Sequence, residues 1–322
     1  MIPLLVLVGP TASGKTELSL RLAEALGGEI VGADSVQIYR DFLIGAAQPT
    51  PAERARAPHH LIGELAPGDE VDANRYVALA SEAIADIDAR DRLPIVCGGT
   101  FLWVRALLFG LAEAPAGDET IRERHRAWAE RDGRQALHAE LARVDAPTAA
   151  RLHPNDFIRV SRALEVYELS GRRMSDVQGE HGFRQARYDA RLLGLEWPRD
   201  VYDARVAARA RIMWEQGLLT EVGELLAAGH GQARAMGAVG YKQVRAALER
   251  GPIQQAELLD EIVRATRVFA RRQRTWLREQ PVEWWDAPSA YDEPAWSQRV
   301  DELRRWWDAT RARRRERGAH EP

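Results

Sequence analysis

A turn rich in small residues carries the clearest chemistry in this chain. Gly9, Gly14, Lys15 and Thr16 match G-x-x-x-x-G-K-[ST], with an apolar run before the turn and a helical pattern after it. Backbone N–H groups in such a turn close on phosphate oxygens, and the dipole of the following helix favours an anion. The lysine adds a mobile cation, and the threonine hydroxyl can ligate Mg²⁺ shared with the phosphates. The motif predicts a phosphate or diphosphate site, and it does not by itself specify ATP.

Asp34, which follows a second short apolar run, is the next candidate. Ordinary P-loop NTPases have an apolar strand that ends in a metal-binding acid, but here the run ending at Cys97 continues into Gly98, Gly99 and Thr100. Asp34 therefore remains as the carboxylate placed to ligate a metal or to accept a proton from a nucleophile. The alternative is that Asp34 only caps a turn, a role that suits aspartate.

An arginine-rich segment near the C-terminus predicts a polyanion site. The sequence RATRVFARRQRTWLR contains no acid, and its arginines are Arg264, Arg267, Arg271, Arg272, Arg274 and Arg278. All except Arg272 recur at helical spacing and share one face. Such a face would repel itself without an anionic ligand, although many charge runs are simply solvated.

Two further pairs of arginines are weaker signals. Arg159 and Arg162 lie on one side of a helix that Asn155 or Asp156 can cap. Arg205 and Arg209 lie one turn apart on a later helix, where they either reach the diphosphate or lie on the surface.

These groups need a scaffold that brings them together. Apolar runs without alternation predict buried parallel strands at residues 4–8, 29–33, 93–97 and 191–195, with helices between them. Ligands of such sheets bind at the carboxyl ends of the strands, where the glycine-rich turn, Asp34 and Thr100 all fall. The predicted fold is α/β, a P-loop parallel-sheet core with an inserted all-helical domain.

The predicted boundaries follow shifts in composition. Residues 1–113 form the first part of the core, 114–188 the helical insertion, 189–287 the completion of the core with the arginine-rich helix, and 288–322 a C-terminal helix with a solvated basic tail. Tryptophans in this last segment, Trp296, Trp306 and Trp307, are expected to pack on the core, the alternative being contact with RNA.

Composition limits the remaining possibilities. A chain of 322 residues with 45% hydrophobic content can bury a sizeable core. The single cysteine excludes an internal disulfide and a multi-cysteine zinc module. A net charge of −3 means that a polyanion must be met by a local basic patch. The first apolar run is too short to span a bilayer, so no membrane association is expected.

Several runs resemble, in order over residues 4–285, the bacterial tRNA dimethylallyltransferases, also called tRNA isopentenyltransferases. These are GPTASGKTELS, ADSVQIYR, APHHLIG, PIVCGGTFLWVRALLFGL, LHPNDFIRVSRALEVYELSG, AVGYKQ and RRQRTWLR. The resemblance implies transfer of a dimethylallyl group from dimethylallyl diphosphate to N6 of the adenosine 3′-adjacent to the anticodon, in tRNAs that read U-initial codons. It also implies Mg²⁺ as cofactor, a tRNA anticodon stem-loop as partner, a cytoplasmic location, a monomer, and contact between the helical insertion and tRNA.

The resemblance implies residue roles by position. Diphosphate binding is implied for Gly9, Thr11, Ala12, Ser13, Gly14, Lys15 and Thr16, with the metal at Thr16. Asp34 would accept the amine proton, Thr100 would assist at the reaction centre, and Arg205 or Arg209 would neutralise the departing diphosphate. tRNA contact is implied for Asp34, Ser35, Val36, Gln37, Ile158, Arg159, Val160, Ser161, Arg162, Gly237, Tyr241, Lys242, Arg271, Arg272, Gln273, Arg274, Trp276 and Arg278.

Departures from the family pattern lie close together in the sequence. They are Asp41, Phe42, Leu43, Ala46, Gln48 and Gly63, and they remove a usual threonine, lysine and aspartate. We take altered tRNA contact as the hypothesis that they raise.

Three other functions compete with this one. An adenylate isopentenyltransferase has little use for an arginine-lined helix. A small-molecule P-loop kinase needs an ATP site with a lid arginine, and an RNA-binding protein with a P-loop sensor does not need Lys15, Thr16 and Asp34 together.

Overall fold

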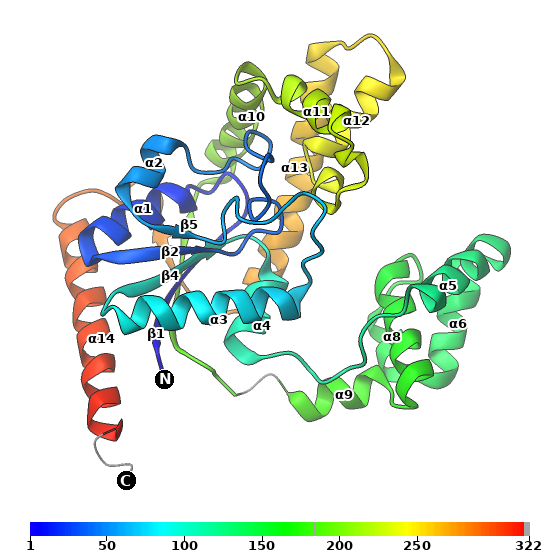
Figure 1. Ribbon diagram of the computed structural model, residues 1–322, viewed down its shortest axis with the longest axis horizontal. Coiled ribbons are helices and arrows are strands. Elements are labelled where there is room, and N and C mark those ends of the chain that lie inside the picture. Colours follow the sequence, from blue (N-terminus) through cyan, green and yellow to red (C-terminus); the bar gives the residue numbers. More distant parts are fainter. Residues whose placement is uncertain (183–184, 319–322) are drawn as a thin grey trace. The chain divides into compact units, whose positions relative to one another are not determined.

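Two compact units make up the chain (Figure 1), and the computed structural model describes residues 1–182 and 185–318. Met1–Leu108 and Arg187–Pro322 form unit 1, and Phe109–Ala186 forms unit 2. The sequence predicted an insertion from residue 114 to 188. Residues 183–184 of that insertion and 319–322 of the expected tail lie outside the described residues. In the described part of the chain, no helix combines the length and the apolar character needed to cross a membrane.

Unit 1 is built on a six-stranded sheet with the order β3-β2-β4-β1-β5-β6, and every pairing is parallel. The strands are β1 Pro3–Val8, β2 Gly28–Gly32, β3 His59–His60, β4 Leu93–Gly98, β5 Asp189–Glu196 and β6 Val282–Asp286. Every residue of β1 and β2 is buried, as expected for strands covered on both faces. The α/β prediction is confirmed; the edge strands β3 and β6 were not predicted.

The register brings three strand ends to one place. Val8 of β1 pairs with Gly98 of β4, and Gly32 of β2 pairs with Cys97. The connection after β2 passes so close to β4 that a Cβ on Gly98 would lie 2.1 Å from the Ala33 carbonyl oxygen. Glycine at this position lets the segments that follow β1, β2 and β4 meet at the same edge of the sheet.

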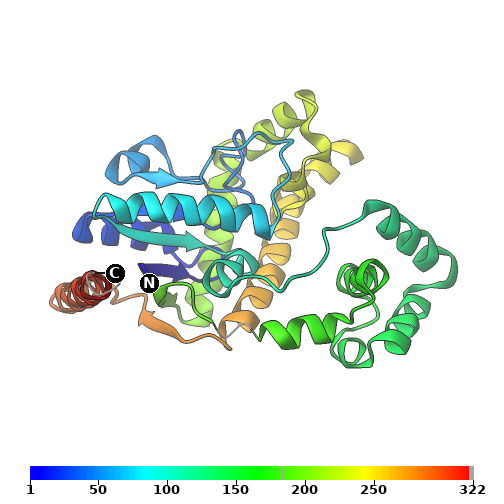
Figure 2. The ribbon, with the colours of Figure 1, turned by 60° about the horizontal axis from the view of Figure 1, so that its bottom comes forward.

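Helices cover the sheet and extend unit 1 beyond it (Figure 1, Figure 2). They are α1 Lys15–Leu26, α2 Pro51–Arg56, α3 Ala73–Ala89, α4 Phe101–Phe109 (which crosses the boundary between the units), α10 Arg199–Glu215, α11 Leu218–Ala227, α12 Tyr241–Arg250, α13 Gln255–Leu277 and α14 Ala295–Gly318, with 3₁₀ turns η1 His230–Gln232 and η2 Arg234–Gly237. Helix α3, drawn in cyan in Figure 2, packs on β2 and β4, and α1 packs on the same strands. Helix α10 packs on α13.

Unit 2 contains helices and, within its described residues, no strand. Its helices are α5 Glu119–Asp132, α6 Arg134–Val144, α7 Ala146–Arg151, α8 Phe157–Ser170 and α9 Met174–His181. A separate small core forms where Leu137 and Leu141 of α6 meet Val160 and Leu164 of α8. The prediction of an inserted all-helical domain is confirmed.

The C-terminal helix α14 packs on α1 and β1 (Figure 1, red). Leu303 and Trp307 are buried in the core under α1, and Trp296 meets Trp285 edge-on at 6.5 Å. Trp306 is partly buried against the same core, which agrees with the expected packing of these tryptophans.

The basic tail is helical as far as Gly318, and residues 312–316 are exposed. Two ion pairs of this segment were not predicted, those of Arg311 with Asp91 and of Arg314 with Asp88. Local patterns cannot indicate these pairs, because the aspartates lie more than 200 residues away along the chain.

Replacing Leu303 with alanine should therefore lower the free energy of unfolding by about 2–4 kcal/mol, because the side chain is 1% exposed. Urea unfolding followed by circular dichroism measures the change. Arg305→Ala on the exposed face of α14 is the control and should change it by less than about 0.5 kcal/mol. Equal effects of the two variants would contradict packing of α14 on the core.

Candidate active site

The glycine-rich turn adopts the geometry of an anion site. Gly14, at the N-terminus of α1, has φ +93°, and Ala12 has φ +62°, so the turn is in the left-handed region at two positions. Lys15 Nζ lies back over the turn and donates to the Gly9 and Pro10 carbonyl oxygens, both at 2.9 Å. Within the described residues the buried Ser13 hydroxyl has no hydrogen-bond partner, so it can bond an incoming phosphate oxygen.

This turn borders a cavity of about 310 Å³, which we call the P-loop cavity. Its lining residues are Ala12, Ser13, Gly14, Lys15, Thr16, Arg205, Ala208, Arg209 and Ile212. The first five come from the turn and α1, and the last four come from α10. The turn therefore forms only one side of the cavity, and α10 supplies the other.

Hydrogen bonds from distant helices hold the turn at Thr11. The Tyr202 hydroxyl of α10 donates to the Thr11 carbonyl oxygen at 2.7 Å. The Thr11 N–H donates to Gln273 Oε1 of α13 at 2.9 Å, and Gln273 Nε2 donates to the Gly99 carbonyl oxygen at 3.0 Å. Gln273 thus joins the turn to the end of β4.

Two arginines of α10 reach the P-loop cavity. The sequence left open whether Arg205 and Arg209 lie at the diphosphate site or on the surface, and both side chains line this cavity. Arg205 Nε donates to the Ala12 carbonyl oxygen at 3.1 Å, and the guanidinium lies 4.1 Å above the Trp197 ring. Arg209 lines the P-loop cavity and also the second cavity described below. Burial lowers the pKa of Arg209, an effect that the charge of Asp34 opposes.

Asp34 both caps a turn and lines a cavity, so its role in the turn is confirmed and its role as metal ligand or proton acceptor stays a prediction. Its Oδ1 accepts hydrogen bonds from the N–H groups of Val36 at 2.9 Å and Gln37 at 3.3 Å. Beside it, Thr100 Oγ1 accepts from the Ser35 N–H at 2.9 Å and lies 3.3 Å from the Ser35 hydroxyl. Asp34, Ser35 and Thr100 line the second cavity.

This second cavity measures about 450 Å³, and we call it the acceptor cavity. Its apolar wall consists of Val206, Ala210 and Met213 of α10 with Ile262 and Phe269 of α13. Its cations are Arg209, Arg234 and Arg272, and two backbone segments, 45–46 and 237–240, close its sides. Arg234 and the apolar wall were not predicted from the sequence, although the spacing of residues 206, 210 and 213 on one helical face is a local signal for the wall.

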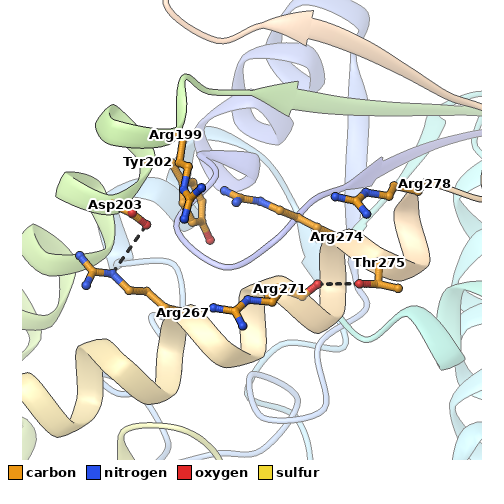
Figure 3. A pocket seen from close by; sticks show the side chains of 8 residues that line it. All are labelled: Arg199, Tyr202, Asp203, Arg267, Arg271, Arg274, Thr275 and Arg278. Carbon is orange, nitrogen blue, oxygen red and sulfur yellow. Dashed lines mark hydrogen bonds and ion pairs between the residues drawn. The ribbon is translucent and has the colours of Figure 1, made fainter.

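The arginine-rich face of α13 lines a third cavity of about 510 Å³, the arginine pocket (Figure 3). Its residues are Arg199, Tyr202, Asp203, Arg267, Arg271, Arg274, Thr275 and Arg278. Arg274 lies 3.9 Å above the Tyr202 ring, and Arg267 Nε lies 3.6 Å from Asp203. Five guanidinium groups thus face a single carboxylate. Arg264 is exposed outside this cavity, and Arg272 turns to the acceptor cavity.

Four residues with an implied tRNA contact are buried, namely Val160, Ser161, Tyr241 and Gln273. A buried side chain meets the surrounding protein rather than an external polyanion, so we assign these four to positioning. Trp276 stacks on Phe101 at 4.5 Å. Gly237 and Lys242 are exposed.

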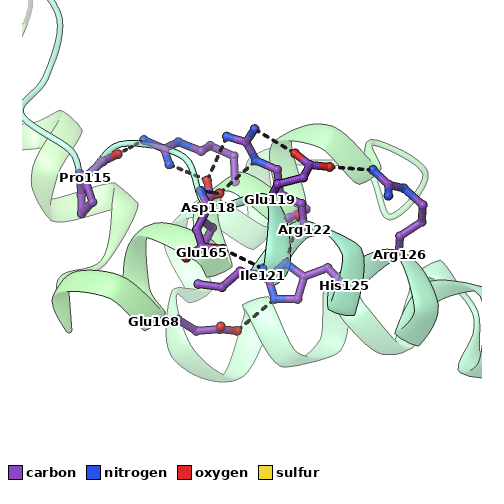
Figure 4. Close-up of polar contacts among 11 residues, drawn as sticks. Pro115, Asp118, Glu119, Ile121, Arg122, His125, Arg126, Glu165 and Glu168 are labelled. Atoms are coloured by element: carbon purple, nitrogen blue, oxygen red, sulfur yellow. Dashed lines mark hydrogen bonds and ion pairs between the residues drawn. The ribbon is translucent and has the colours of Figure 1, made fainter.

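Arg162 is also engaged inside unit 2. It pairs with the buried Glu165 and donates to the Pro115 carbonyl oxygen at 2.6 Å. Glu165 further accepts from the Asp118 N–H at 2.7 Å and lies 2.9 Å from Arg122 Nε (Figure 4). Arg162 therefore fixes the start of unit 2 onto α8, whereas Ile158 and Arg159 of the same helix are exposed.

Two of the departures from the family pattern occupy neighbouring positions. Gln48 Nε2 donates to the carbonyl oxygens of Gln37 at 3.0 Å and Tyr39 at 2.7 Å, and its Oε1 accepts from Arg54 at 3.0 Å. A Cβ on Gly63 would lie 2.9 Å from Gln48 Oε1. The usual lysine at position 48 and aspartate at position 63 would therefore lie side by side. Their joint loss removes one positive and one negative charge from the same place. Gln48 still keeps the loop hydrogen-bonded.

The parallel sheet and the glycine-rich turn between β1 and α1 define a P-loop α/β protein. The family model described as IPP transferase matches residues 37–280, and that described as isopentenyl transferase matches residues 2–62. The chain belongs to the IPP transferase family, that of the tRNA dimethylallyltransferases.

Similar proteins agree with this assignment. The tRNA dimethylallyltransferase of Sorangium cellulosum is 60% identical over 87% of this chain and 88% of its own, and that of Anaeromyxobacter dehalogenans is 50% identical over 92% and 99%. The crystal structure of the tRNA isopentenylpyrophosphate transferase from Bacillus halodurans has a TM-score of 0.69 at 33% identity, covering 99% of this chain and 100% of its own. A eukaryotic dimethylallyltransferase described as acting on tRNA has a TM-score of 0.76 at 26% identity, covering 93% and 78%.

Diphosphate affinity should depend on pH through Lys15. Burial lowers the pKa of the Lys15 ammonium to about 8. Below this pH the lysine is charged and attracts the anion; above it the lysine loses its proton, so affinity for inorganic diphosphate should fall by up to about tenfold per pH unit. Calorimetric titration between about pH 7 and 9.5 measures the change.

Lys15→Arg is the matched control, because a guanidinium remains charged throughout this range. Its affinity should vary little with pH. A native affinity that is equally flat would contradict a lowered pKa at Lys15.

Proposed function

We propose that this chain transfers a dimethylallyl group from dimethylallyl diphosphate to N6 of the adenosine 3′-adjacent to the anticodon, in tRNAs that read U-initial codons. The observation that carries the proposal is that Arg209 lines both the P-loop cavity and the acceptor cavity. A diphosphate in the first cavity and a base in the second meet at this side chain. Family membership supports the same activity.

The proposed reaction forms a C–N bond and breaks the C–O bond to the diphosphate. An exocyclic adenine amine is a weak nucleophile, so holding it in line with the allylic carbon supplies much of the rate. Asp34 accepts the proton that the amine loses, and Thr100 assists beside it. Lys15, Arg205, Arg209 and the N–H groups of the turn stabilise the charge that develops on the departing diphosphate.

The proposed cofactor is Mg²⁺ at Thr16. Its hydroxyl is the hard oxygen donor that Mg²⁺ prefers, and it borders the P-loop cavity. Within the described residues no cluster of three or more His, Cys, Asp or Glu could hold a metal. Thr16 would therefore hold the ion together with oxygens of a bound diphosphate. When bound, Mg²⁺ neutralises charge on the diphosphate.

We propose that the tRNA backbone contacts the arginine pocket of unit 1 and the exposed Ile158 and Arg159 of unit 2. Further proposed contacts are Ser35, Val36, Gln37, Gly237, Lys242 and Arg272. The target base leaves its stack to enter the acceptor cavity, as in other enzymes that modify bases. We propose in addition a cytoplasmic location and a monomeric state.

Single-turnover transfer of a labelled dimethylallyl group, with Mg²⁺, tests the proposal. An unmodified anticodon stem-loop and free AMP are offered in parallel. We expect label on the RNA alone and a fall of about 100-fold or more in Asp34→Asn, which keeps the shape of the side chain but cannot accept the proton.

Asp308→Asn, on the exposed face of α14, is the matched control and should leave the rate unchanged. Label on AMP would favour an adenylate isopentenyltransferase. ATP turnover without any transfer would favour a kinase.

Binding of the stem-loop should weaken steeply with salt because arginines displace counterions from phosphates. Removing Arg271 or Arg278 from the arginine pocket should lower the slope of log affinity against log salt by about one for each arginine–phosphate ion pair that is removed. Fluorescence anisotropy at several salt concentrations measures the slope. Arg305→Ala removes the same charge from α14, and an equal decrease in this control would contradict a local phosphate site.

A further inference from the structure

A buried carboxylate that does not line the P-loop cavity organises one wall of the acceptor cavity. Glu221 of α11 is 8% exposed. Its Oε2 accepts from the N–H groups of Leu43 at 3.0 Å and Ile44 at 2.6 Å, and its Oε1 accepts from that of Gly45 at 3.1 Å. Three successive backbone donors thus converge on one anion, which is a strong arrangement because each bond is charge-assisted.

Tyr241, the first residue of α12, extends the same network. Its hydroxyl donates to Glu221 Oε1 at 2.7 Å and accepts from the Ala46 N–H at 3.0 Å. Burial, followed by the negative charge and the hydrogen bond of Glu221, raises the pKa of Tyr241, so the hydroxyl keeps its proton and remains a donor. Four successive N–H groups, from residue 43 to 46, are therefore held by two side chains.

The network joins two separate sides of the acceptor cavity. Gly45 and Ala46 line one side, and residues 237–240, which directly precede Tyr241, line another. The fit around the tyrosine ring is close, because a Cβ on Gly45 would lie 2.5 Å from it and Phe42 meets it edge-on at 5.0 Å. The position of Tyr241 therefore sets how far apart these two backbone walls stand.

We propose that Glu221 and Tyr241 are positioning residues that hold the two backbone walls of the acceptor cavity at the spacing required by the acceptor base, without touching it. This inference rests on the proposed function. It assigns Tyr241 to the geometry of the base site rather than to direct contact with tRNA. Because neither residue lines the P-loop cavity, their replacement should affect the acceptor and spare the diphosphate.

The test uses Tyr241→Phe, which removes both hydrogen bonds but keeps the ring, and Glu221→Gln, which removes the charge. Each variant should raise KM for the anticodon stem-loop by about tenfold to hundredfold, as expected when a hydrogen bond to a charged group is removed. The affinity for inorganic diphosphate should stay within about twofold of the native value in both variants. Thermal unfolding identifies a variant that fails to fold, and the other variant then carries the test.

Tyr188→Phe is the matched control, because it also removes one tyrosine hydrogen bond, the one donated to the Ser81 hydroxyl, at a residue that lines none of the three cavities. It should leave both KM for the stem-loop and the affinity for inorganic diphosphate within about twofold of the native values. An unchanged KM in both test variants, or an equal fall in acceptor and diphosphate affinity, would overturn the inference.

Hydrogen exchange separates this inference from the proposed function. The amides of residues 43–46 should exchange faster in Tyr241→Phe whatever the enzyme transfers, and unchanged exchange would overturn the inference. If the native protein transfers nothing to the stem-loop, the proposed function fails, and the exchange result still reports on the network.

Discussion

The site depends on the way Thr11 is held. A glycine-rich turn with left-handed backbone at Ala12 and Gly14 does not keep one shape by itself, because positive φ is unfavourable for a residue with a Cβ. Here Tyr202 binds the carbonyl oxygen of Thr11 and Gln273 binds its N–H. The glycine-rich turn therefore takes its final shape only when α10 and α13, encoded in the C-terminal part of the chain, have packed against it.

The arginines of this chain illustrate how position changes the role of a charge. Helices α13 and α14 both carry dense arginine runs. In α14, Arg311 and Arg314 pair with aspartates beside the sheet, so their charge is neutralised and serves packing. Along α13 and at its C-terminal end, four arginines share a cavity with Asp203 as its one acid. Uncompensated charge, rather than charge content, marks the surface suited to a polyanion.

Local patterns predicted the strands before the turn and Asp34, because apolar runs and small-residue turns are encoded by neighbouring residues. Local patterns could not predict the hydrogen bonds of Tyr202 and Gln273 to Thr11, or those of Glu221 to the loop at residues 43–45. These hydrogen bonds join residues that lie 176 to 262 positions apart in the sequence. The two-residue strand β3 could not be predicted either, because only its pairing with β2 makes it a strand and its sequence carries no strand pattern.

The attachment of the helical unit has an evolutionary consequence. Where the chain leaves unit 1 and where it returns, the Arg187 N–H donates to the Leu108 carbonyl oxygen at 2.9 Å. The two ends of the insertion are thus fastened together whatever lies between them. Closing a longer segment costs only about 0.6 kcal/mol for each doubling of its length. Lineages can therefore enlarge, trim or exchange this module at a small entropic cost without shifting the register of β4 or β5.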